Sequence, residues 1–239
     1  HGDCLEIMKN IPDKSVDMIL CDLPYGTTSC KWDIVIPLDK LWKQYERIIK
    51  DNGAIVLFGQ QPFTTLLISS NVEMFRHNLI WEKDKCANFL HAKNQPRKTC
   101  EDIIVFSKPN SGFVHNAKNK CTYNPQLIDR KPRKPVESKK NIKKSQNLKN
   151  IRPNNSILQS SNDFMSDKTY PSCLVYFKTE HKNRLHPTQK PIALLEYLIK
   201  TYSNENEVVL DNCMGSGSSG IACLNTNRKF IGIELDDKY

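Results

Sequence analysis

The chain has 239 residues, of which 38% are hydrophobic, and carries a formal net charge of +9. This length predicts one domain, or one domain with an insertion. No apolar run approaches the roughly 18 residues that a membrane-spanning helix needs, so we expect no membrane association. The chain opens on His1-Gly2-Asp3 without a signal peptide or a start Met, and we expect it to be part of a longer sequence.

Nine cysteines are scattered along the chain, and no two of them form a Cys-x-x-Cys pair. Several lie inside apolar runs, where a free cysteine behaves as a small hydrophobic residue. This pattern argues against a zinc site, and we expect no bound metal. It also argues against a disulfide framework and predicts a protein of the reducing cytoplasm.

The positive charge is concentrated in residues 130–152, defined here as the basic tract. This tract holds ten Lys or Arg residues and one acid, Glu137, whereas the rest of the chain has equal numbers of basic and acidic residues. A neutral body with one basic segment is typical of proteins that bind a polyanion such as nucleic acid. A solvated, disordered linker has a similar composition, so both interpretations stay open.

Strands and helices alternate over residues 1–108. Residues 16–21 are apolar apart from Asp17 and predict a buried parallel strand. Amphipathic spacing predicts a helix over 37–50. A short helix is expected after Asp3, another helix over 60–69, and strands at 54–58, 77–81 and 102–106. This alternation indicates a doubly wound, mostly parallel α/β sheet.

The alternating pattern stops over residues 109–180, which are rich in Asn, Lys, Ser and Pro. So long a span without periodic structure is usually functional or disordered, and we interpret it as an inserted recognition region. The pattern resumes over 181–239, where we expect helices at 191–202 and 221–225 and strands at 208–211 and 230–234. Residues 1–108 and 181–239 are therefore expected to form the two halves of one core.

Two polar motifs follow predicted strands. Asp22-Leu23-Pro24-Tyr25 comes directly after the first strand, at the edge of an α/β sheet where ligands bind. A plain turn, with a capping Asp and a packed Tyr, is the alternative. Gly215-Ser216-Gly217 follows the strand that ends at Asp211, and Glu234 closes the next strand. Such a turn and such an acid together predict a nucleoside cofactor.

These motifs resemble those of the amino-group DNA methyltransferases, which have Asp-Pro-Pro-Tyr and Asp-Pro-Phe-x-Gly-Ser-Gly in the two positions. The chain has Asp22-Leu23-Pro24-Tyr25 before Asp211-Asn212-Cys213-Met214-Gly215-Ser216-Gly217, which is the permuted order of the β class. His186-Pro187-Thr188-Gln189-Lys190-Pro191 is similar to the element that the family places before the cofactor turn. The resemblance implies a circularly permuted, Rossmann-like methyltransferase fold around an inserted basic recognition region.

The resemblance further implies methyl transfer from S-adenosylmethionine to the N6 amino group of an adenine flipped out of double-stranded DNA. Asp22 and the Leu23 carbonyl would bind the amine, Pro24 would fix the loop and Tyr25 would stack on the base. Transfer to the N4 amine of cytosine is the nearest alternative, and a non-catalytic nucleic-acid-binding protein on a relic fold is another. Methylation at cytosine C5 would require a Pro-Cys pair, which the chain lacks.

The same resemblance assigns the remaining residues. The expected cofactor-binding residues are Asp3, Asp211, Cys213, Gly215, Gly217, Glu234, His186, Thr188 and Lys190. For Asp3 a helix N-cap, and for His186 and Lys190 a helix-start role, are the alternatives. The expected nucleic-acid-binding residues are Gln95, Arg97, Lys131, Arg133, Lys139, Lys140, Lys143 and Lys144. We interpret Trp81 as a packing residue and Lys83 as a solvated charge. The resemblance is also compatible with a homodimer, and it implies a bacterial or phage source.

Overall fold

The computed structural model describes residues 1–28, 30, 33–86, 88–113, 118–129, 167–180 and 189–237. It divides into two compact units, one made of His1–Pro125 with Ser172–Tyr239 and the other of Gln126–Pro171. In the second unit, β7 (Ile128–Asp129) pairs antiparallel with β8 (Lys168–Thr169). The basic tract lies outside the described residues.

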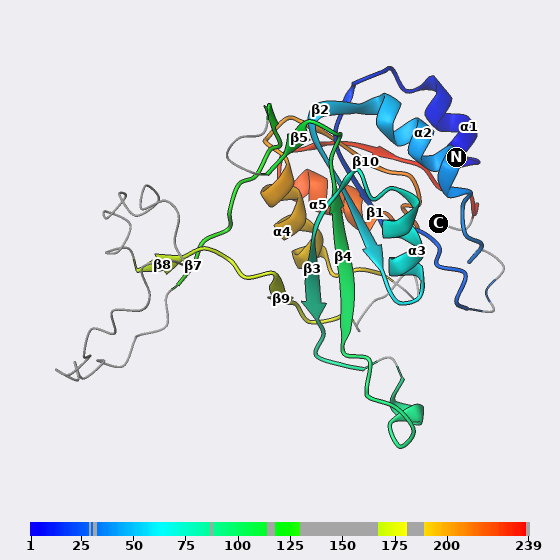
Figure 1. Cartoon of the computed structure of the whole chain (residues 1–239), viewed down its shortest axis with the longest axis vertical. Coiled ribbons are helices and arrows are strands. Elements are labelled where there is room, and N and C mark those ends of the chain that lie inside the picture. The colour runs from blue at the N-terminus through cyan, green and yellow to red at the C-terminus, as the bar shows by residue number, and fades with distance from the viewer. Residues whose placement is uncertain are drawn as a thin grey trace, which may run out of the picture. The chain divides into compact units, whose positions relative to one another are not determined.

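The first unit contains a seven-stranded sheet in the order β11-β10-β1-β2-β4-β3-β9 (Figure 1). The strand bounds are β1 (Val16–Cys21), β2 (Ile49–Gly59), β3 (Phe75–Glu82), β4 (Cys100–Phe106), β9 (Leu174–Tyr176), β10 (Val208–Asp211) and β11 (Lys229–Gly232). Within this sheet β4 runs antiparallel to both of its neighbours, and the other pairs are parallel. The predicted mostly parallel sheet is confirmed.

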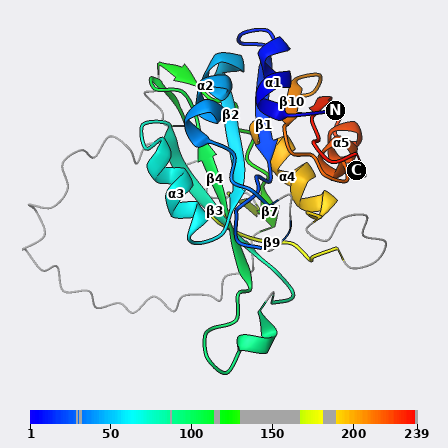
Figure 2. The same ribbon diagram turned by 90° about the vertical axis from the view of Figure 1, so that its right-hand side faces the viewer.

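Helices cover both faces of this sheet (Figures 1 and 2). Their bounds are α1 (Cys4–Ile7), α2 (Leu38–Ile48), α3 (Phe63–Ser70), α4 (Ile192–Tyr202) and α5 (Ser218–Asn225). Ile19 and Cys21 of β1 pack with α1, α2 and α3, whereas Met18 and Leu20 pack with α4 and α5. Because successive side chains of a strand point to opposite faces, the all-apolar end of β1 fills two cores and forms the centre of a doubly wound fold.

Shorter elements complete the first unit. They are the 3-10 turns η1 (Met8–Asn10) and η2 (Phe89–His91) and the paired strands β5 (Ser111–Gly112) and β6 (Asn119–Lys120). No helix among the described residues is long and apolar enough to cross a membrane.

Several predicted bounds shift in the structure. The helix expected over 37–50 ends at Ile48, because the chain turns directly into β2 at Ile49. The helix expected over 60–69 begins at Phe63, after Pro62. Leu174–Tyr176, inside the predicted insertion 109–180, forms β9 and pairs with β3. The second unit is therefore shorter than the predicted insertion, whose role in recognition stays a prediction.

Candidate active site

The candidate site lies where the parallel strands of the sheet end. Asp22 follows β1, Asp211 ends β10 and Glu234 follows β11. Because β4 is antiparallel, its first residues, with Glu101, lie at this same edge. The side chains surround a cavity of about 1160 Å³. The predicted residues that line it are Asp3, Asp22, Leu23, Pro24, Tyr25, Lys190, Asp211, Cys213, Gly215 and Glu234.

The glycine-rich turn between β10 and α5 lines the cavity. Gly215 and Gly217 have φ angles of 50° and 75°, in the left-handed region that favours glycine. The backbone amide of Gly215 donates to Glu234 Oε2 at 2.7 Å. Glu234 Oε1 accepts from the amides of Leu235 and Asp236 at 2.9 Å. The carboxylate therefore holds the turn and the segment after β11 together.

Asp211 is a buried acid beneath this turn. Its carboxylate accepts from the Ser219 hydroxyl and from the amide of Cys213. Burial raises the pKa of Asp211 to about 6, although these hydrogen bonds favour the ionised form. Asp211 is therefore anchored to both the turn and the start of α5 and fixes their position at the end of β10.

Asp3 caps a helix, which is the alternative given for it from the sequence. It is the N-cap of α1, and its carboxylate accepts from the amide of Leu5 at 2.8 Å. Asp3 also lines the cavity. The neighbouring backbone amide of Gly2 donates to the Glu234 carbonyl at 2.8 Å and holds this segment against the chain after β11. The N-cap thus places an acid beside Glu234.

Asp22 also lines the cavity, and side chains of the protein occupy both of its carboxylate oxygens. Asp22 Oδ1 accepts from the Tyr25 hydroxyl, and Asp22 Oδ2 accepts from Lys190 Nζ, both at 2.7 Å. The Tyr25 ring stacks on Phe63, with centroids 5.0 Å apart and an interplanar angle of 23°. Lys190, expected beside the cofactor, therefore lies on the acid of the catalytic motif.

Glu101 joins this group from β4. Glu101 Oε1 is 2.8 Å from the Tyr25 hydroxyl and 2.9 Å from Lys190 Nζ, and Oε2 is paired with Lys83. We call Asp22, Tyr25, Lys83, Glu101 and Lys190 the Asp22 cluster. Only 15% of the Lys83 side chain is exposed, so its interpretation as a solvated charge is wrong.

The charges of the Asp22 cluster perturb one another. Burial raises the pKa of Asp22 above its ordinary value, and Lys190 offsets this only in part. Burial also opposes ionisation of Glu101, but Lys190 and Lys83 outweigh it and bring the pKa of Glu101 to about 2. Burial alone would lower the pKa of Lys190, yet Asp22 and Glu101 raise it. Glu101 thus pairs with both lysines, whereas Asp22 pairs with Lys190.

Asp33 organises the loop that follows Tyr25. Its buried carboxylate accepts from the amides of Gly26, Thr27 and Thr28 and from the Thr28 hydroxyl, at 2.6 to 2.9 Å. Burial opposes ionisation, but these hydrogen bonds lower the pKa of Asp33. Gly26 has a φ of 67°, which lets the loop turn back over the cavity. Sequence reasoning missed Asp33, although an acid after a Gly-Thr-Thr turn is a recognisable signal.

Other predicted site residues lie elsewhere. Gly217 is next to the lining residues Ser216 and Ser218, and a Cβ added to it would meet no atom within 4 Å. Gln95 and Arg97 are exposed on the loop between β3 and β4. His186, Thr188, Lys131, Arg133, Lys139, Lys140, Lys143 and Lys144 lie outside the described residues.

A doubly wound sheet with a glycine-rich nucleoside turn and an acidic aromatic loop on one cavity defines a Rossmann-like methyltransferase. The model of the family N6_N4_Mtase, described as DNA methylase, matches residues 16–239. The chain belongs to this family of DNA methylases.

Curated relatives agree with this assignment, and a solved structure shares the fold. The chain is 28% identical to DNA adenine methyltransferase YhdJ of Escherichia coli K12, covering 100% of this chain and 78% of that protein. It is also 28% identical to type II methyltransferase M.HpaI of Haemophilus parainfluenzae, covering 100% and 70%. The solved M1.HpyAVI–SAM complex matches with a TM-score of 0.63 at 24% identity, over 100% of this chain and 94% of that one.

A second solved structure extends the comparison. The PvuII DNA methyltransferase, named as cytosine-N4-specific, matches with a TM-score of 0.66 at 14% identity, over 98% and 80% of the two chains. At this identity the match shows the fold alone. The fold is therefore shared by an enzyme whose name gives the N4 amine of cytosine as its target.

Proposed function

We propose that the protein transfers a methyl group from S-adenosylmethionine to the N6 amine of an adenine flipped out of double-stranded DNA. The observation that carries this proposal is that the Gly215–Glu234 turn, Asp22 and Tyr25 all line the same cavity. A methyl donor bound at the turn and a base bound at Asp22 could therefore be in direct contact. The adenine specificity in the name of the YhdJ relative, and Asp at position 22, support adenine as the target.

The residues present fit the cofactor. Gly217 leaves open space where other residues have a Cβ, and the amides of the turn lie beside a carboxylate. Asp3 and Glu234 provide acceptors for the amine and hydroxyls of an adenosine, and the buried Asp211 supports the turn near the cofactor's amino acid end. When bound, S-adenosylmethionine supplies a methyl group on a positively charged sulfur.

Asp22 and Leu23 would act on the target amine. The lone pair of an adenine amine is delocalised into the ring, so the amine is a poor nucleophile. Hydrogen bonds from its two N–H groups to the Asp22 carboxylate and the Leu23 carbonyl favour a tetrahedral nitrogen and localise the lone pair. The Leu23 side chain is buried, with 3% exposed, and Pro24 fixes the next φ, so this carbonyl is held in place. The chain thus contributes positioning and electrostatics.

The direct test combines labelling with base analysis. The full chain is incubated with S-adenosylmethionine carrying a tritiated methyl group and with unmethylated genomic DNA, which is then digested to nucleosides. Label in N6-methyl-2′-deoxyadenosine supports the proposal. Label in N4-methyl-2′-deoxycytidine would identify the cytosine alternative, and no label in DNA would leave a non-catalytic binding protein. Long-read sequencing of the same DNA gives the recognition site.

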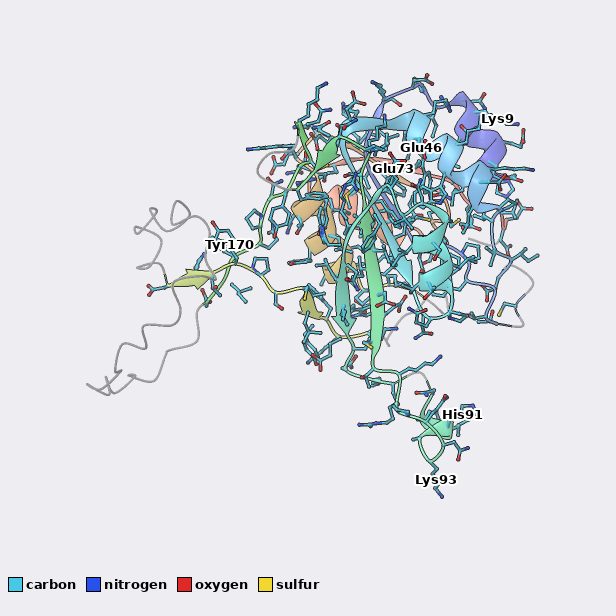
Figure 3. All side chains as sticks on the ribbon, in the orientation of Figure 1. Lys9, Glu46, Glu73, His91, Lys93 and Tyr170 are labelled. Atoms are coloured by element: carbon cyan, nitrogen blue, oxygen red, sulfur yellow. The ribbon has the colours of Figure 1, made fainter. Side chains whose placement is uncertain are left out.

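We also propose a DNA-contacting surface on the loop between β3 and β4, residues 83–99. Figures 1 and 3 show this loop extending away from the sheet, with His91 and Lys93 near its far end. The Asn88 side chain joins the two strands of the loop. Its Nδ2 donates to the Pro96 carbonyl at 3.1 Å, and its Oδ1 accepts from the backbone amide of Lys98 at 2.6 Å. The base of the loop lines the cavity, so duplex DNA with a base in the cavity would lie against it.

Gln95 and Arg97 belong to this exposed loop, and we assign them to DNA contacts. Phosphate contacts by the basic tract stay a prediction. The homodimer and the cytoplasmic location also stay predictions. Named relatives are bacterial, which agrees with a bacterial or phage source.

Replacing Lys93 and Arg97 by Ala should weaken DNA binding on all sequences and flatten its salt dependence. Each phosphate contact releases condensed counterions and adds about 0.9 to the slope of log affinity against log salt. Fluorescence anisotropy at several salt concentrations measures this slope. The matched control is Lys9→Ala, an exposed lysine far from the loop (Figure 3). A slope equal to that of the control would remove the loop from the interface.

Replacing Tyr25 by Ala should weaken capture of the flipped base by about 1–3 kcal/mol, the usual contribution of base–aromatic stacking. Phe63 covers one face of the Tyr25 ring, and Lys190 Nζ lies 5.9 Å from the ring centroid. Tyr25→Phe should keep this affinity because it keeps the ring. Fluorescence of 2-aminopurine placed at the mapped target measures base flipping. Equal losses in the Phe and Ala variants would contradict the stacking role.

A further inference from the structure

Both oxygens of the Asp22 carboxylate are engaged by the protein's own side chains. Oδ1 is bound by the Tyr25 hydroxyl and Oδ2 by Lys190 Nζ, each at 2.7 Å. The proposed reaction requires this same carboxylate to accept an N–H of the target base. Each oxygen can accept a second hydrogen bond, but an amine that approaches along the direction occupied by Tyr25 or Lys190 displaces that donor from Asp22.

Displacement from Asp22 would be unfavourable if the released donor had no other partner. The Lys190 side chain is only 10% exposed, and a buried charge left without a counter-ion is strongly destabilising. Glu101 provides that partner, because its Oε1 already lies 2.9 Å from Lys190 Nζ and 2.8 Å from the Tyr25 hydroxyl. Tyr25 has a single hydroxyl proton, so Asp22 and Glu101 compete for it.

We propose that Glu101 is a positioning residue that retains Lys190 and the Tyr25 hydroxyl while Asp22 exchanges them for the target amine. This proposal rests on the proposed function and adds a residue to it. Glu101 is anchored for this role, since its second oxygen is paired with Lys83 and only 6% of its side chain is exposed. The two lysines balance the two carboxylates, so the exchange leaves no net charge in the cluster.

The titration of the two acids agrees with this division of roles. The pKa of Glu101 is lowered to about 2, so it stays ionised, whereas burial raises that of Asp22. The groups that face Asp22 are Tyr25 from its own loop, Glu101 from β4, Lys190 from the segment before α4 and Asp211 from β10. Of the two acids, Asp22 has the more exposed side chain, 24% against 6%, so its bond to Lys190 is the more accessible to an incoming amine.

The first test is the pH profile of kcat/KM for Glu101→Gln, which reports the groups that titrate in the free enzyme. Loss of the Glu101 charge commits Lys190 to Asp22, so the rate at neutral pH should fall by about 10–100-fold. The same loss removes a negative neighbour and lowers the pKa of Asp22. Activity requires ionised Asp22, so the acid limb should move to lower pH. A slower variant with an unmoved acid limb would contradict the proposal.

The second test reverses a sign. Lys190→Gln in the wild type leaves the Asp22 and Glu101 carboxylates together without their shared cation and should slow the reaction. In the Glu101→Gln background it frees Asp22 and should accelerate the reaction. A decrease in both backgrounds would overturn the proposal.

Controls separate this effect from loss of folding. Asp17→Asn removes a buried acid outside the Asp22 cluster, in β1 and paired with Lys50, and should lower the melting temperature without moving the acid limb. If Glu101→Gln fails to fold, Lys83→Met replaces it. This variant removes a cation from the cluster, so the acid limb should move to higher pH, and a limb that stays in place would contradict the proposal.

All rates are measured with tritiated S-adenosylmethionine and unmethylated genomic DNA. A wild-type protein that transfers no label to DNA would reject the proposed function itself. A wild-type protein that is active, with variants that fail the two tests above, would reject only the role of Glu101.

Discussion

Asp22→Ala is expected to lower methyl transfer by about 10²–10³, the usual effect of removing one hydrogen bond at a reacting centre. Asp22 accepts the target amine in the proposed reaction, and its hydrogen bonds are to Tyr25 and Lys190, not to the Gly215–Glu234 turn. Affinity for S-adenosylmethionine should therefore stay nearly unchanged. Single-turnover labelling of unmethylated DNA gives the rate, and isothermal titration calorimetry gives the cofactor affinity.

The Asp22→Ala variant should remain folded, because Lys190 keeps its ion pair with Glu101. Its melting temperature provides the check. The Asp17→Asn variant is the matched control for removing a β1 acid outside the cavity. A rate above about a tenth of wild type in a folded Asp22→Ala protein would remove Asp22 from catalysis.

Glu234→Ala should weaken cofactor binding by about 10–100-fold, as expected for losing hydrogen bonds to a charged group. The Glu234 carboxylate accepts three backbone amides, among them that of Gly215, and these fix the turn beside the cavity. Its loss removes both the acceptor proposed for the ribose and the support of the turn. Calorimetric titration with S-adenosylmethionine measures the affinity directly.

Asp237→Ala is the control for Glu234→Ala, because this exposed acid also lines the cavity and its Oδ1 lies 2.8 Å from His1 Nε2. We expect it to bind the cofactor as the wild type does. Equal losses in both variants would indicate a general charge effect instead of the proposed contact. Together, Asp22→Ala and Glu234→Ala should separate transfer from cofactor binding.

The sequence by itself determined the parts of the site that are local. The apolar run of β1 and the turn chemistry of Asp22-Leu23-Pro24-Tyr25 and Gly215-Ser216-Gly217 are encoded within a few residues, and strand ends in a doubly wound sheet share one edge. These features allowed the fold class, the cofactor turn and the acidic loop to be predicted. Residues joined by local hydrogen bonds, such as Asp3 at the N-cap of α1, were also predictable.

Only the tertiary structure decided the partners of Asp22. Lys190 is 168 positions away in the chain, and Glu101 reaches the site because β4 runs antiparallel to β2. No short-range periodicity specifies that register, so Glu101 and Lys83 could not be distinguished from ordinary surface charges. Lys190 was assigned to the cofactor because of the motif that precedes α4. In the folded chain its ammonium group instead lies between the carboxylates of Asp22 and Glu101. The opposite charges there offset the cost of removing the ammonium group from water.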